Sequence, residues 1–152
     1  MRDQTDLRDV ERYNLEVVDR QGYRFTRATQ PFKPREVVFS VVGQTFTAPT
    51  IFTIQVAADC HVLTTCGSYV NHSCQPNCGF DSRQRVFRAL HLIQAGDEIT
   101  FDYHTTEYEL CSPFQCQCGA IHCVQQVLGY KHLAAVHRQR LAPWTAAHLN
   151  LR

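Results

Sequence analysis

The chain has 152 residues, of which 44% are hydrophobic, and its 15 basic and 14 acidic residues give a formal net charge of +1. This length and apolar content predict one compact domain with its own core. A charge so close to zero gives no global attraction to nucleic acid or to anionic membranes, so we expect no direct nucleic-acid or membrane partner. No run approaches the about 18 apolar residues of a membrane-spanning helix, and residues 1–12 are too charged for a secretory signal, so we expect an intracellular protein, nuclear or cytoplasmic.

Short β-like runs dominate the chain as far as residue 103. After a charged, flexible N-terminal arm over residues 1–12, the pattern predicts strands over 15–18, 22–25, 37–42, 52–56, a stretch after Asp59, 86–93 and 99–103. Gln94 to Asp97 reads as a turn, so the last two runs are expected to form a hairpin.

The texture becomes helical only after Cys123. Leu133, Val136 and Leu141 lie near one face of a 3.6-residue period, and Pro143 stops the segment. The expected helix is a cap on the core.

Polar side chains crowd into one stretch, Asn71-His72-Ser73-Cys74-Gln75-Pro76-Asn77. Pro76 lacks a backbone donor and biases the residue before it away from helix, while Asn77 suits a turn. The stretch therefore predicts a fixed loop that brings side chains to one point. The alternative is an ordinary surface turn that contains a cysteine.

Eight cysteines without a secretory signal favour metal binding or simple burial over disulfides. Cys116, Cys118 and Cys123 fall within eight residues, and Gly119 allows the chain to fold back, which is the spacing of a zinc knuckle. Structural zinc takes four ligands, so one more is needed, and His122 is awkwardly placed beside Cys123. The alternative is three reduced thiols without metal.

The other four cysteines have no comparable spacing and are expected to be small, buried or half-buried hydrophobes: Cys60, Cys66, Cys78 and Cys111.

Three segments in order resemble those of the SET-domain protein lysine methyltransferases: the loop 71–77, then Gly96-Asp97-Glu98-Ile99-Thr100-Phe101-Asp102-Tyr103, then the Cys-x-Cys-x4-Cys cluster of a post-SET segment. The resemblance implies a mainly β, β-clip-like fold of small sheets, with a pseudoknot beside the first motif and the helical cap at the C-terminus. It also implies that Cys74 is the fourth zinc ligand. The implied boundaries are a minimal SET domain over 13–110, a post-SET zinc segment over 111–125 and a C-terminal helical extension over 126–152.

The same resemblance implies methyl transfer from S-adenosylmethionine to the side-chain amine of lysine in a protein. Tyr103 matches the tyrosine beside the reacting amine, and Phe101 matches the channel position that sets how many methyl groups are added. The residues expected at the cofactor are Tyr23, Tyr69, Asn71, His72 and Phe114.

Departures from the family pattern keep an alternative open. Gly22-Tyr23-Arg24 stands where the family usually has Gly-x-Gly, and Ser68 replaces an arginine. Arg24 is a candidate partner for the cofactor carboxylate. The main alternative is a catalytically inactive SET-like protein-interaction module that retains structural zinc. A cysteine-dependent enzyme on Cys74 and His72 is disfavoured, since a zinc-bound thiolate would be occupied.

A stretch without Lys or Arg contains five carboxylates: Asp97, Glu98, Asp102, Glu107 and Glu109. Such a region attracts a basic, lysine-bearing protein or peptide, with histones among the candidates; the plainer interpretation is a solvated acidic edge.

Overall fold

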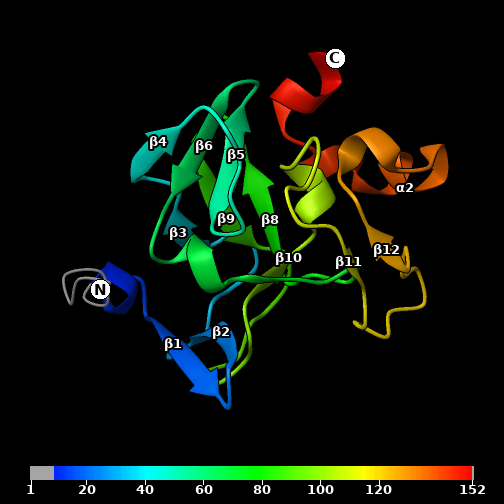
Figure 1. Cartoon of the computed structure of the whole chain (residues 1–152). Helices are drawn as coiled ribbons and strands as arrows, with labels where there is room; N and C mark the ends of the chain where they lie inside the picture. Colours follow the sequence, from blue (N-terminus) through cyan, green and yellow to red (C-terminus); the bar gives the residue numbers. More distant parts are fainter. Residues whose placement is uncertain (1–8, 152) are drawn as a thin grey trace.

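The computed structural model describes residues 9–151, and within this range small sheets surround one core (Figure 1). Most of the expected N-terminal arm, residues 1–8, lies outside the described residues. Of the remainder, Val10 is buried in the core with 1% of its surface exposed. The prediction of a mainly β fold with a short C-terminal helix is confirmed.

The strands are short, and most of them lie before residue 102. Their bounds are β1 Leu15–Arg20, β2 Tyr23–Ala28, β3 Val37–Ser40, β4 Gln44–Phe46, β5 Thr53–Ala57, β6 Cys60–Leu63, β7 Asn71–His72, β8 Cys78–Asp81, β9 Val86–Ala89, β10 Thr100–Phe101, β11 Phe114–Gln115 and β12 Gln126–Val127. The helical turns are η1 Gly67–Tyr69, η2 Tyr103–Thr105, η3 Tyr130–His132, α2 Ala135–Leu141, η4 Ala142–Trp144 and η5 Ala147–Leu151.

Within residues 9–151 these strands form five sheets, with orders β1-β2, β3-β9-β8, β4-β6-β5, β10-β7 and β11-β12. All pairings are antiparallel except that of β7 with β10, which is parallel. The turn between β1 and β2 contains Gly22 at φ +91°, a conformation that glycine adopts without strain. The predicted strand 22–25 therefore begins one residue later, at Tyr23.

The predicted hairpin between residues 86–93 and 99–103 is wrong. The turn itself exists, because the Asp97 amide donates to the Gln94 carbonyl at 3.1 Å. Its flanks, however, bond elsewhere: Phe32 bridges Ile93 and Arg27 bridges Glu98. β9 pairs with β3 and β8, which leaves β10 free to pair with β7. Hydrophobic runs beside a turn do not show which strand each run pairs with.

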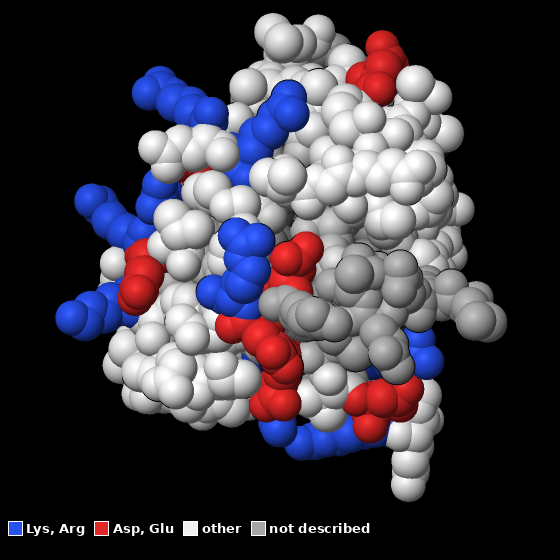
Figure 2. All heavy atoms as spheres, turned by 90° about the vertical axis from the view of Figure 1, so that its left-hand side faces the viewer, with Lys and Arg blue, Asp and Glu red and all other residues white. Residues whose placement is uncertain are grey.

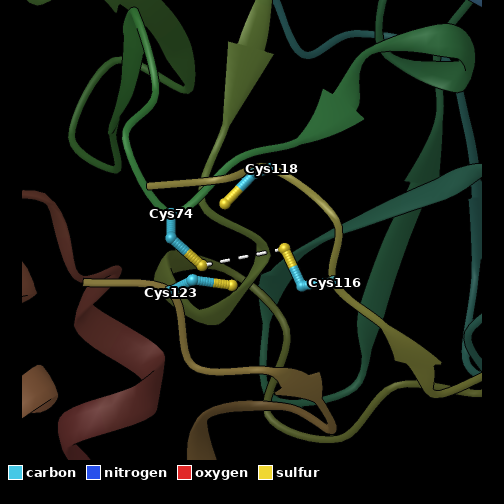
Figure 3. A group of neighbouring side chains, drawn as sticks. All are labelled: Cys74, Cys116, Cys118 and Cys123. Atoms are coloured by element: carbon cyan, nitrogen blue, oxygen red, sulfur yellow. Dashed lines mark hydrogen bonds between the residues drawn. The ribbon is translucent and has the colours of Figure 1, made fainter. Parts of the chain in front are cut away.

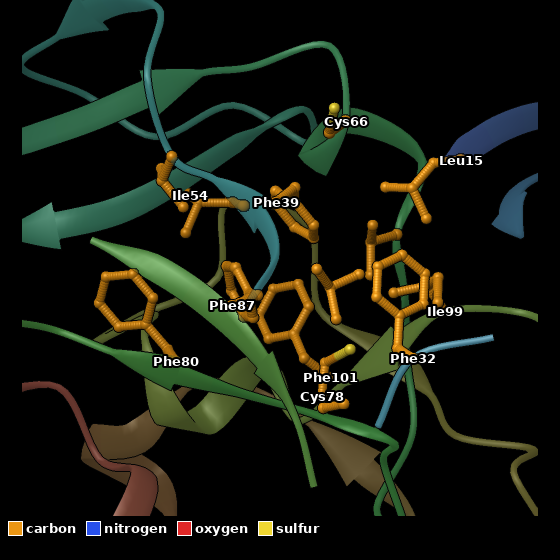
Figure 4. Close-up of a cluster of buried hydrophobic side chains, with 14 of the residues drawn as sticks. Leu15, Phe32, Phe39, Ile54, Cys66, Cys78, Phe80, Phe87, Ile99 and Phe101 are labelled. Carbon is orange, nitrogen blue, oxygen red and sulfur yellow. The ribbon is translucent and has the colours of Figure 1, made fainter. Parts of the chain in front are cut away.

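Four phenylalanines form the centre of the core (Figure 4). The Phe87 ring stacks on Phe39 with centroids 4.8 Å apart, and it lies 5.2 Å from Phe80 and 4.6 Å from Phe101. Because Phe101 belongs to β10, this aromatic cluster fixes the strand that leads to Tyr103.

The C-terminal segment packs on the sheets, though not through the face expected from the sequence. Leu133 and Leu141 are buried as predicted, whereas Val136 is 69% exposed. α2 has only 7 residues, too few for a long amphipathic face. The fully buried contacts come later, from Ala146 and Leu149 in the final turns. Among the described residues, no helix combines the length and apolar character needed to cross a membrane.

Replacing the central ring should be costly. We expect Phe87→Ala to lower the free energy of unfolding by about 3–5 kcal/mol, because it removes buried contacts and leaves a cavity. Urea unfolding followed by fluorescence measures the change. Phe46→Ala, at a half-buried position of β4, is the control and should cost much less; equal losses would contradict a core centred on Phe87.

Candidate active site and metal centre

The loop 71–77 is held in place by a second strand and by one asparagine. β7 pairs with β10, and the Ser73 amide donates to the Phe101 carbonyl at 3.1 Å. Asn77 then bonds the following segment twice: its Nδ2 donates to the Glu98 carbonyl at 2.8 Å, and its Oδ1 accepts from the Thr100 amide at 2.9 Å. The expected fixed loop is present, and its side chains have a defined direction.

Four thiols meet below this loop (Figure 3). The sulfur atoms of Cys74, Cys116, Cys118 and Cys123 all lie within 4.8 Å of one another, with the sulfurs of Cys74 and Cys116 3.9 Å apart. A tetrahedron with zinc–sulfur bonds of about 2.3 Å has edges of about 3.8 Å. The donor set therefore suits zinc, while His122 is exposed and outside the group.

The thiols differ in how readily they ionise. Burial raises the pKa of Cys74 well above its ordinary value. Burial also opposes ionisation of Cys118, but backbone amides of Ala120 and Cys74 stabilise its thiolate and bring its pKa down to about 7. A bound cation would favour all four thiolates.

His72 connects the thiols to the predicted catalytic tyrosine. Its Nδ1 accepts the backbone N–H of Tyr103 at 3.1 Å, and its Nε2 lies 3.3 Å from the sulfur of Cys74. Burial lowers the pKa of His72 to about 4, so the ring is neutral at pH 7. With Nδ1 accepting, the proton sits on Nε2 and is donated to the sulfur.

Tyr103 lines a small pocket. Its hydroxyl donates to the Val70 carbonyl at 2.8 Å, and its ring is 4.8 Å from Phe101, 5.2 Å from His72 and 6.0 Å from Phe114. Burial raises the pKa of Tyr103 far above its ordinary value, so the hydroxyl stays protonated.

That pocket has a volume of about 280 Å³. Its wall combines the four aromatic residues Phe52, Phe101, Tyr103 and Phe114 with aliphatic and hydroxyl side chains of β5, η1 and residues 110–112. The lining mixes apolar and aromatic surface with hydroxyl groups and one carboxylate, a combination found in small-ligand pockets.

The remaining predicted cofactor residues form a second group. Asn71 Nδ2 donates to the Tyr23 hydroxyl at 3.1 Å, to the Arg24 carbonyl at 3.0 Å and to Glu98 at 3.0 Å. The Tyr23 hydroxyl in turn donates to Glu98 at 2.9 Å. The Arg24 guanidinium lies over the Tyr69 ring at 5.8 Å and bonds Asp19. Tyr23, Tyr69 and Asn71 are thus adjacent, while His72 and Phe114 belong with Tyr103.

Three buried polar residues lie near the site: Asp102, His104 and Glu107. Asp102 caps η2 through the His104 amide and also accepts from His104 Nδ1 at 2.7 Å. Glu107 is 7% exposed and lines the pocket. Aspartate before a helical turn is a recognisable cap signal, but Thr-Thr-Glu has no periodicity that would indicate the burial of Glu107.

The acidic stretch is not a continuous solvated edge. Asp102 and Glu107 are buried, Glu98 is bonded to Tyr23 and Asn71, and Glu109 pairs with Lys131 at 3.0 Å. Burial of Cys66 and Cys78 is confirmed, whereas Cys111 is exposed, contrary to expectation.

Charges of both signs are interleaved on the face shown in Figure 2, in keeping with ion pairs such as Arg27 with Glu16 at 2.7 Å. That face presents no extended field of one sign among the described residues.

Comparison with solved structures supports this fold. A crystal structure of KRYPTONITE in complex with mCHG DNA and SAH superposes with a TM-score of 0.57 and 23% sequence identity, over 76% of this chain and 29% of that one. At this identity the likeness establishes the architecture alone.

Sequence comparison identifies the family. The SET domain family model matches residues 23–104, more than half of the chain, so the chain belongs to the SET domain family. It is 33% identical over 108 residues to the methyltransferase flvH of Aspergillus flavus, covering 67% of this chain and 60% of that protein. It is 26% identical over 139 residues to an H3 lysine-36 specific histone-lysine N-methyltransferase of Gibberella zeae, covering 73% of this chain but 15% of that protein.

Metal analysis tests the four-thiol site. We expect the purified chain to hold one equivalent of zinc and Cys74→Ser to lose most of it, because the serine hydroxyl is a poor substitute for a thiolate. Mass spectrometry of total metal gives the ratio. Cys60→Ser, outside the group, is the control; a Cys74→Ser variant with full zinc would show that this sulfur is not a ligand.

Proposed function

We propose that the chain transfers a methyl group from S-adenosylmethionine to the side-chain amine of lysine in a protein. The observation that carries the proposal is the pocket lined by Tyr103, Phe101 and Phe114. An unbranched aliphatic amine suits a small pocket that combines aromatic surface with a tyrosine in its wall.

The relatives favour this substrate class and cofactor. Two are named as methyltransferases, one of them specific for a histone lysine, and the structural neighbour was solved with SAH. We infer a basic, lysine-bearing protein or peptide as substrate, with histones among the candidates, and hence a nuclear or cytoplasmic location. The chain spans 60% of the first relative and 15% of the second. The substrate is therefore proposed from the pocket together with these names.

The cofactor would contact the two groups of residues beside the pocket. The Arg24 guanidinium over Tyr69 offers a cation for its carboxylate, and Asn71 with Tyr23 shapes the adjoining wall. His72 and Phe114 supply apolar ring surface next to Tyr103. When bound, S-adenosylmethionine would supply a sulfonium methyl group, whose carbon an amine lone pair can attack while the thioether sulfur leaves.

The task left to the protein is geometry and control of one proton. Tyr103 donates its own hydrogen to Val70, so its oxygen lone pairs are free to accept from the substrate amine and to aim the nitrogen. Free lysine has a pKa near 10.4, so presenting it neutral at pH 7 costs roughly 4–5 kcal/mol. Apolar walls lower that cost because they disfavour the charged ammonium.

The zinc cluster would support the reaction at a distance. Its ligands join the segment 111–125, which includes Phe114, to the loop that carries Asn71 and His72. We propose that this segment and the extension 126–152 complete a minimal SET domain over 13–110.

Removing the Tyr103 hydroxyl should abolish most of the activity. With labelled S-adenosylmethionine and core histones, we expect transfer by the wild type and a loss of about a hundredfold or more in Tyr103→Phe, since the group that aims the amine is gone. Tyr108→Phe is the matched control. No label and no cofactor binding in the wild type would favour an inactive interaction module.

Phe101 should set the number of methyl groups. Its ring leaves room and offers no hydroxyl, so we expect di- or trimethylated product from the wild type and a shift toward monomethyl product in Phe101→Tyr, where a hydroxyl can hold a water or the amine. Mass spectrometry of the products decides. Trimethyllysine from the variant would contradict this role.

A further inference from the structure

Glu107 is a carboxyl group in the wall of an otherwise neutral pocket. Among the described residues that line the pocket there is no lysine, arginine or histidine, and Glu107 is their single carboxylate. Burying a carboxylate in an apolar pocket is unfavourable unless it is paired or functional. This position therefore requires an explanation beyond packing.

The side chain is fixed from two directions. Its Oε1 accepts the backbone N–H of Gln55 in β5 at 2.8 Å and the Thr106 hydroxyl at 3.0 Å. Its own backbone N–H donates to the Tyr103 carbonyl at 2.9 Å, so the carboxylate stands one helical turn beyond the predicted catalytic tyrosine. Glu107 and Tyr103 thus enter the same pocket in a fixed relation.

One oxygen remains for a ligand. Glu107 Oε2 accepts no hydrogen bond from any described residue, and Glu107, which is 7% exposed, lines the pocket. This oxygen can therefore accept a hydrogen bond from a ligand in the pocket that brings a donor.

The surroundings adjust the proton affinity of this group. Burial raises the pKa of Glu107 to about 7, with the Gln55 and Thr106 hydrogen bonds partly opposing the rise. The titratable groups around it are Tyr103 and Cys111 in the pocket wall, with Tyr130 on η3 and His148 on η5 behind it. Burial raises the pKa of both Tyr103 and Cys111, so neither carries a charge at pH 7. A carboxyl of this kind exchanges protons near physiological pH.

We propose that the Glu107 carboxylate receives the substrate ammonium and accepts its proton before methyl transfer. The inference rests on the proposed function and adds a catalytic residue to it. The ammonium N–H bond breaks and a carboxyl O–H bond forms; the freed lone pair then attacks the methyl carbon while the carbon–sulfur electron pair leaves with sulfur. The methylated nitrogen carries the positive charge away, and the carboxyl later returns its proton to solvent.

The pH profile of Glu107→Gln tests the step. Glutamine keeps the volume and can still accept from Gln55 and Thr106, but it takes no proton. Under single-turnover conditions with core histones, we expect a loss of about tenfold or more at pH 7.5. The loss should shrink toward pH 10, where lysine gives up its proton unaided. A loss constant across this range, or no loss, would overturn the proposal.

Two further variants separate chemistry from folding. Glu109→Gln, at an exposed ion pair two residues away, should keep the wild-type rate. Glu107→Asp retains a proton acceptor one methylene further back, so its rate should fall while its profile keeps the wild-type shape. Zinc content and SAH binding confirm that each variant is folded. A Glu107→Asp profile like that of Glu107→Gln would also count against proton transfer.

A binding measurement keeps this inference distinct from the proposed function. In wild-type protein carrying ¹³C-labelled glutamate, the Glu107 carboxyl titration should move to lower pH by about one unit on addition of n-butylammonium and stay unchanged with n-butanol. If histones are not methylated but this shift is observed, the proposed methyl transfer is refuted and the proposed amine-binding site at Glu107 is retained. No shift would overturn the role of Glu107 whatever the activity.

Discussion

The parallel pairing of β7 with β10 is the constraint on which the site depends. Each strand has only two residues, Asn71–His72 and Thr100–Phe101, so the pairing alone is weak. It persists because Phe101 is anchored on Phe87 in the core and because Asn77 bonds both Glu98 and Thr100. Once the pairing forms, it fixes the positions of the residues that follow each strand. Ser73 and Cys74 follow β7, and Asp102 and Tyr103 follow β10.

His72 connects the two segments that this pairing places side by side. It bonds the Tyr103 backbone on one side and the Cys74 sulfur on the other, so the four-thiol cluster and Tyr103 share one buried, neutral ring. The C-terminal extension adds a further contact, since Arg140 Nη1 donates to the Cys74 carbonyl at 3.0 Å. A disturbance at the thiols therefore reaches Tyr103 through hydrogen bonds of fixed direction, which are more sensitive to displacement than apolar packing is.

What the sequence could predict follows from how local each signal is. The loop 71–77 and the thiols of Cys116, Cys118 and Cys123 were recognisable because their residues are contiguous or closely spaced. The hairpin after residue 86 failed because pairing depends on distant residues such as Phe32 and Arg27, which periodicity does not connect to Ile93 and Glu98. The prediction that Val136 packs on the core failed because a helix of 7 residues has no extended apolar face that periodicity could reveal.

Glu107 shows the same limit at the site itself. In the sequence it is one of five carboxylates in an acidic stretch, and charge patterning predicts that such residues are exposed to solvent. Its burial comes from the turn that begins at Asp102 and from a backbone donor in β5, fifty-two residues away. Both contacts exist only after the sheets have assembled. The group with the strongest electrostatic consequence in the pocket is thus created by tertiary structure, because the same side chain on an exposed edge would keep an ordinary acid strength.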